Sequence, residues 1–174
     1  MVGTLLFIYN IYATVFSKVG VHKNKTTKEL LISGFGIDGM LNLVHKLTGK
    51  QPYSKEPALS LPVVAIFRGT VDTFLDALII LGAGILVLVY LFADLGGFSL
   101  DVKSVDALLY KNWFWWGLDL VADGLVLIYV AGSWYLLATL ITGQKLFMEN
   151  VARAALMLEL LVSWMVWSHH LLAD

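Results

Sequence analysis

Two long apolar stretches, residues 61–93 and 113–142, constrain the fold of this chain more than any other feature of its sequence. A helix that crosses a lipid bilayer needs about 20 mostly apolar residues, and both stretches exceed that length. The chain of 174 residues is 59% hydrophobic and 14% charged, with a mean hydropathy of +0.78. Soluble domains carry about 25% charged residues, and disordered chains need low hydrophobicity. The sequence therefore predicts a membrane protein.

Two further segments are apolar but shorter. Residues 151–167 are near the lower limit for a span, and residues 1–16 lack the basic leader and the small-residue cleavage site of a secretory signal. We therefore expect an all-α fold, a polytopic membrane helix bundle with three long transmembrane helices plus a short N-terminal apolar segment. In this interpretation residues 1–17 are a partial or short transmembrane segment, 18–60 are a cytoplasmic loop, and 61–174 are the transmembrane helices.

The distribution of lysine predicts how the helices are oriented. Seven of the twelve Lys and Arg residues lie between positions 18 and 55, and loops rich in Lys and Arg stay on the cytoplasmic side. The three predicted spans then run outward, inward and outward in chain order, and residues 94–112 lie outside. Within the first loop, residues 30–47 are apolar but contain three glycines, and we interpret them as an interfacial or re-entrant piece.

Ionisable side chains occur inside the predicted spans, where they are costly and usually mark function. The first long stretch carries Arg68, Asp72 and Asp76. Arg68 and Asp72 are four residues apart, so they share a helix face and can neutralise each other. Asp76 has no such neighbour, which makes it the better candidate for a proton path.

Three other residues share a predicted depth in the outer half of the membrane. Asp119 lies near the start of the inward-running helix, and His169 and His170 lie at the end of the last outward-running one. Imidazole suits copper, iron or zinc, and a carboxylate is compatible with iron, so these residues are candidate metal ligands. The alternative is that the His pair is an interfacial polar cap and that Asp119 pairs with a basic group. Asp123 lies one turn deeper than Asp119 on the same helix face.

The order of these residues resembles the catalytic subunit of heme-copper oxidases, cytochrome c oxidase subunit I among them. Residues 105–110 and 113–117 are similar to the start of the sixth helix of that family. His169-His170 stands where the family's seventh helix ends in a His-His pair that ligates the active-site copper, and Val151-Ala152-Arg153 resembles the Met-Ala-Arg that opens this helix in one branch. The resemblance covers residues 58–174, which would then correspond to family helices five to seven.

The departures from the family pattern point to one branch of it. Asp119 stands in place of the helix-six copper His, and Asp123 stands in place of the Tyr that the oxygen-reducing enzymes carry. Residues 119–124 resemble instead the His-Leu-x-Val-Glu-Gly pattern of nitric oxide reductases, in which nonheme iron replaces copper. The resemblance implies reduction of nitric oxide or oxygen at a heme/nonheme-metal centre coupled to electron transport. It implies Asp119, His169 and His170 as ligands of copper or nonheme iron, and Asp123 as a catalytic proton donor.

The resemblance also implies partners and a location. The family ligates its hemes from its second and tenth helices, so we expect this chain to be a fragment or one piece of a split subunit, and to be inactive alone. The implied partners are the remaining helices of the catalytic subunit, other respiratory subunits, membrane lipid, and cytochrome c or quinol as electron donor. The implied location is a bacterial or archaeal plasma membrane rather than a mitochondrial inner membrane. A net charge of −1 argues against a nucleic-acid partner.

Two other function classes stay open at this point. One is a degenerate, noncatalytic membrane subunit of a respiratory complex, which metal content would distinguish. The other is a small ion transporter in which Asp72, Asp76, Asp119 and Asp123 line the ion path. An inverted repeat would favour the transporter, and none is visible in the sequence.

The predicted orientation can be tested directly, because the chain contains no cysteine. Single cysteines introduced at Lys50 and at Lys103 should react with a membrane-impermeant reagent from opposite sides of the membrane, because the lysine-rich segment is predicted inside and the segment after the first span outside. Equal labelling of both positions from one side would contradict the topology.

Overall fold

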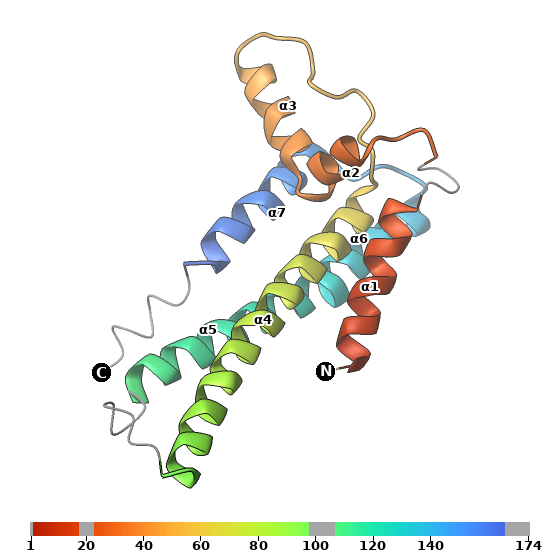
Figure 1. Cartoon of the computed structure of the whole chain (residues 1–174). Coiled ribbons are helices and arrows are strands. Elements are labelled where there is room, and N and C mark those ends of the chain that lie inside the picture. The colour runs from red at the N-terminus through yellow and green to blue at the C-terminus, as the bar shows by residue number, and fades with distance from the viewer. Residues whose placement is uncertain (1, 18–22, 98–106, 166–174) are drawn as a thin grey trace.

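The computed structural model describes residues 2–17, 23–97 and 107–165, and all secondary structure in these segments is helical (Figure 1). The expected all-α class is therefore confirmed. The chain forms an elongated bundle in which the longest helix, α4 (Leu61–Leu95), runs beside a second long helical run.

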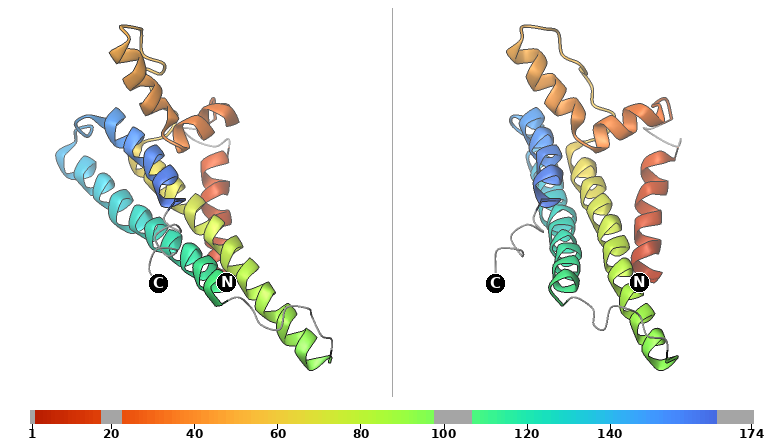
Figure 2. Two further views of the ribbon diagram at one scale, coloured as in Figure 1. Left: turned by 90° about the vertical axis from the view of Figure 1, so that its left-hand side faces the viewer. Right: turned by 60° about the vertical axis from the view of Figure 1, so that its left-hand side comes forward.

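The two long apolar stretches form the two longest helical runs. The second run consists of α5 (Ala107–Leu125), the π-helical segment η2 (Val126–Gly132) and α6 (Ser133–Thr142), and it lies antiparallel to α4 (Figures 1 and 2). Within the described residues, two helices are long and apolar enough to cross a membrane, Leu61–Leu95 and Tyr110–Thr142. These correspond to the first and second predicted spans.

The third predicted span is not confirmed. Helix α7 covers Glu149–Ser163, which is shorter than the roughly 20 residues that a span requires. Residues 164 and 165 form a turn, and residues 166 and 167 of the expected segment lie outside the described residues. The N-terminal helix α1 (Val2–Phe16) is apolar but short, as expected, and packs against α4.

The segment expected to be a cytoplasmic loop with an interfacial or re-entrant piece contains two short helices, α2 (Thr27–Gly34) and α3 (Ile37–Leu47). A capping box starts α2: the Thr26 hydroxyl accepts from the Glu29 N–H, and the Glu29 carboxylate accepts from the Thr26 N–H at 2.7 Å. The Thr26 N–H lowers the pKa of Glu29, because it stabilises the ionised carboxylate. Gly36 separates the helices with a φ of 71°, and a side chain there would overlap the backbone of α7.

An aromatic cluster joins these helices to α1 and α4. The ring of Phe67, which is 1% exposed, packs edge-on against Tyr12 at 5.2 Å, Phe35 at 5.6 Å and Phe16 at 6.0 Å between centroids. Such edge-to-face contacts are favourable beyond the burial of area alone. The cluster fixes the beginning of α4 against α1 and the turn between α2 and α3.

Close backbone contact holds α4 against the second long run. Gly69 of α4 faces Gly124 of α5, and a Cβ atom on either glycine would overlap the other's backbone carbonyl oxygen. Small residues at helix interfaces in membranes allow such close approach, which strengthens van der Waals packing. This contact lies two residues before η2 begins, so the irregular part of the second run starts next to a close approach of the two backbones.

The packing at Gly69 predicts a selective effect of added methyl groups. Gly69→Ala should destabilise the chain by about 1–3 kcal/mol, because the backbones must separate to accommodate the methyl group. Gly84→Ala, on the same helix where the described chain leaves open space, is the matched control and should leave stability unchanged or slightly raised. Thermal unfolding in detergent micelles, followed by circular dichroism, measures both. Equal effects would contradict the close contact.

Candidate functional site

A buried ionic cluster connects α4 to α7. Arg68 is fully buried; its Nη1 donates to Asp72 Oδ1 at 2.9 Å, and its Nη2 donates to Glu159 Oε2 at 2.6 Å. Its Nε donates to the Leu156 carbonyl at 3.1 Å. The second oxygen of Glu159 accepts from the Ser163 hydroxyl at 2.7 Å. Each nitrogen of the guanidinium therefore has an acceptor, and two of these acceptors are carboxylates.

The expected pairing of Arg68 with Asp72 is confirmed, but the sequence analysis missed Glu159. The sequence does contain a signal that could have indicated Glu159, because it is an acidic residue inside the third apolar segment. Spacing along one helix predicts the Arg68–Asp72 pair, whereas the pair with Glu159 depends on how α7 docks on α4. That docking is a tertiary feature which no periodicity encodes.

Asp76 lies one turn beyond Asp72 and has very different surroundings. It is 0% exposed, and neither of its carboxyl oxygens makes a hydrogen bond within the described part of the chain. Asp72 and Asp123 are close enough to interact with it electrostatically. In the described part of the chain its surroundings therefore differ from those of Asp72, which accepts a hydrogen bond from Arg68.

The proposed metal ligands are only partly described. Asp119 is partly buried on α5, whereas His169 and His170 lie outside the described residues. The last described turn of α7 does approach α5, since the rings of Trp116 and Trp164 meet edge-on with 6.1 Å between centroids. Asp119 is about one turn from this contact, on the side toward α6.

The described residues alone do not form a three-ligand metal site. No group of three His, Cys, Asp or Glu side chains that could hold a metal occurs among them. His45 is the single histidine in the described ranges, and its Nδ1 lies 2.6 Å from the Gln51 carbonyl, in the segment that contains α2 and α3. A metal site would therefore need residues beyond those described, as the proposal involving Asp119 and the His pair does.

Gly124, in the segment that resembles the nitric oxide reductase pattern, has a structural role of its own. It packs against Gly69 of α4, so the Asp123-Gly124 pair does not by itself indicate reductase chemistry. The π-helical segment η2 begins two residues later, and such segments often occur at functional sites.

A second buried arginine joins the ends of four helices. Arg153 of α7 donates through Nη2 to the Leu59 carbonyl and to Glu149 Oε1, both at 2.6 Å, and through Nη1 to the Ser33 hydroxyl at 3.3 Å. Asp38 of α3 lies 3.5 Å from the same Nη1. Arg153 therefore fixes α2 and α3 to the beginnings of α4 and α7.

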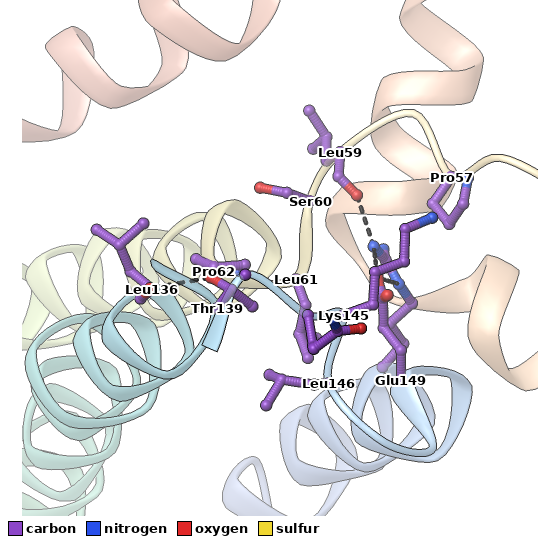
Figure 3. Close-up of a pocket in the computed structure, with 13 residues that line it drawn as sticks. Pro57, Leu59, Ser60, Leu61, Pro62, Leu136, Thr139, Lys145, Leu146 and Glu149 are labelled. Atoms are coloured by element: carbon purple, nitrogen blue, oxygen red, sulfur yellow. Dashed lines mark hydrogen bonds and ion pairs between the residues drawn. The ribbon is translucent and has the colours of Figure 1, made fainter. Parts of the chain in front are cut away.

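Arg153 also borders a cavity of about 480 Å³ between the beginning of α4, the end of α6 and the turn into α7 (Figure 3). Ser60, Thr139 and Lys145 contribute polar groups to its lining. Thr139 is 20 residues from Asp119, which corresponds to about 30 Å along a helix. The cavity is thus separate from the aspartates in the middle of the spans.

Comparison with known protein families gives a match over the whole chain. The family described as "Cytochrome C and Quinol oxidase polypeptide I" matches residues 1–174. No curated protein and no solved structure matches the chain.

The ionic cluster predicts strong coupling between Arg68 and Asp72. Arg68→Met should destabilise the chain by about 3–5 kcal/mol, because it leaves two carboxylates without their cation. Adding Asp72→Asn to this variant should restore part of the loss, since one uncompensated buried charge is removed. A double-mutant cycle of thermal unfolding in micelles measures the coupling. Additive effects of the two substitutions would contradict the buried pair.

Proposed function

The chain belongs to the cytochrome c and quinol oxidase polypeptide I family, and from this premise we propose that it forms part of the catalytic subunit of a respiratory heme-copper oxidase. The single observation that carries the proposal is the family match over residues 1–174. The family is an oxidoreductase family of integral membrane proteins, and the two helices long and apolar enough to span a membrane agree with it. The proposed reaction is the reduction of oxygen or nitric oxide, with electrons from cytochrome c or quinol.

The finer proposal is a nitric oxide reductase-like metal centre. Asp119, His169 and His170 would hold copper or nonheme iron, and the bound metal would supply a Lewis-acid and redox centre beside a heme held by other helices. The resemblance of residues 119–124 to the reductase pattern supports this choice, as does the approach of α7 to α5 at the Trp116–Trp164 contact. The proposed setting is a bacterial or archaeal plasma membrane.

Asp123 is proposed as the proton-handling residue of this centre. It is partly buried one turn beyond Asp119 on the same helix, and a carboxylate at this position can accept and release a proton whereas an amide cannot. Its interaction with Asp72 and Asp76 places it in a group of acidic side chains between α4 and α5.

The metal proposal predicts different outcomes for three substitutions, made in membranes that contain the complete respiratory complex. Asp119→Ala should lose most of the nonheme metal, whereas Asp119→His should retain metal and favour copper, because a third imidazole replaces the harder carboxylate. Asp123→Asn should keep the metal and slow turnover by about 100-fold or more.

Elemental analysis of the purified complex and its rate of nitric oxide and oxygen reduction are the measurements. Asp94→Asn, at the exposed end of α4, is the control and should change neither. Unchanged metal content in Asp119→Ala would show that Asp119 is not a ligand. Absence of nonheme metal in the unaltered complex would favour a noncatalytic, degenerate subunit.

A further inference from the structure

Asp76 lies on the face of α4 that packs against α5. Residues 69, 73, 76 and 80 share this face by helical spacing. Gly69 and Thr73 approach Gly124, and Ile80 approaches Gly117 one level farther along. Asp76 lies between these two levels, so its carboxyl group is enclosed by the α4–α5 interface itself.

An ionised carboxylate is very costly at such a place. A charge removed from water needs a counter-ion or several hydrogen-bond donors, and Asp76 has no hydrogen-bond donor among the described residues. The guanidinium of Arg68, two turns away on α4, is shared between Asp72 and Glu159. A further negative charge at Asp76 would face Asp72 on its own helix and Asp123 on α5.

We propose that Asp76 is a proton-binding site buried between α4 and α5, at which the side chain holds an exchangeable proton as a neutral carboxylic acid. Asp72 stays ionised beside it because Arg68 neutralises Asp72. Among the described residues, the charged groups that interact with Asp76 are Asp72 on α4 and Asp123 on α5. Arg68 on α4, Tyr12 on α1 and Glu159 on α7 interact with Asp72. This assignment rests on burial and on the lack of donors, and it does not depend on the proposed catalytic role of Asp123.

In this proposal the proton of Asp76 can be exchanged with the carboxylate of Asp123. When the proton moves from Asp76 to Asp123, Asp76 becomes a carboxylate and Asp123 becomes a carboxylic acid. No electrons move, and the total charge of the acidic group is unchanged. The exchange would occur at a level of α5 one turn deeper than Asp119.

Infrared spectroscopy of the full chain in lipid nanodiscs tests the proposal without any heme or metal. At neutral pH we expect the carbonyl-stretch band of a protonated carboxylic acid, which shifts in D₂O because the proton is exchangeable. Asp76→Asn should lose this band and should keep its helix content, since a neutral amide replaces a neutral acid. Asp94→Asn, at an exposed position of the same helix, is the matched control and should retain the band.

Asp76→Glu provides a second readout should the amide variant fail to fold. It should keep a protonated-acid band at a shifted frequency, and an unshifted band would assign the proton to another residue and overturn the proposal. Absence of the band in the unaltered chain, or its persistence in a folded Asp76→Asn variant, would also overturn it. The spectra are recorded in sodium chloride and in choline chloride. A band that disappears only with sodium would show that the group binds a metal cation instead of a proton.

Discussion

The arrangement of α2, α3, α4 and α7 depends on one constraint: a guanidinium that is removed from water must be neutralised and fully hydrogen-bonded. Arg68 and Arg153 are both 0% exposed, and each binds carboxylates and a backbone carbonyl from other parts of the chain. Removing a partner from a buried ion pair costs far more than the pair contributes as a whole. The two arginines therefore limit how α7 can shift against α4, and one of them also fixes the two helices outside the spans.

The sequence predicts the parts of this structure that depend on neighbours along one helix. It predicts the two long spans from their length and the Arg68–Asp72 pair from its spacing. It does not predict the contact of Arg153 with Asp38 or that of Arg68 with Glu159, because residues far apart in the chain meet only after the helices dock. The glycines before and within α3 predict a break in this segment, but they do not predict what the break is for. Gly36 allows the close approach of α7, and only the folded chain shows this contact.

The family match and the candidate catalytic residues answer different questions. Family membership rests on the match to the whole chain, whereas the choice between oxygen and nitric oxide rests on two positions, Asp119 and Asp123. The glycine after Asp123 packs against α4, where a Cβ atom would overlap the Gly69 carbonyl, so its presence does not distinguish the two reactions. The distinguishing information therefore lies in the two carboxylates and in the metal that Asp119 is proposed to hold.

Asp72 and Asp76 show why intramembrane charges cannot be interpreted from sequence spacing alone. They are four residues apart on one helix, and both are fully buried. Asp72 has a guanidinium at 2.9 Å, so its negative charge is compensated where it lies. Asp76 lies one turn beyond Asp72, on the side away from Arg68. The charge of Arg68 is already matched by Asp72 and Glu159, so it does not compensate a third carboxylate. In a medium of low dielectric constant the next carboxyl group lowers its energy by keeping its proton. The position of Arg68 thus gives the two aspartates different roles: Asp72 is an ion-paired structural residue, and Asp76 is the proposed proton-binding site.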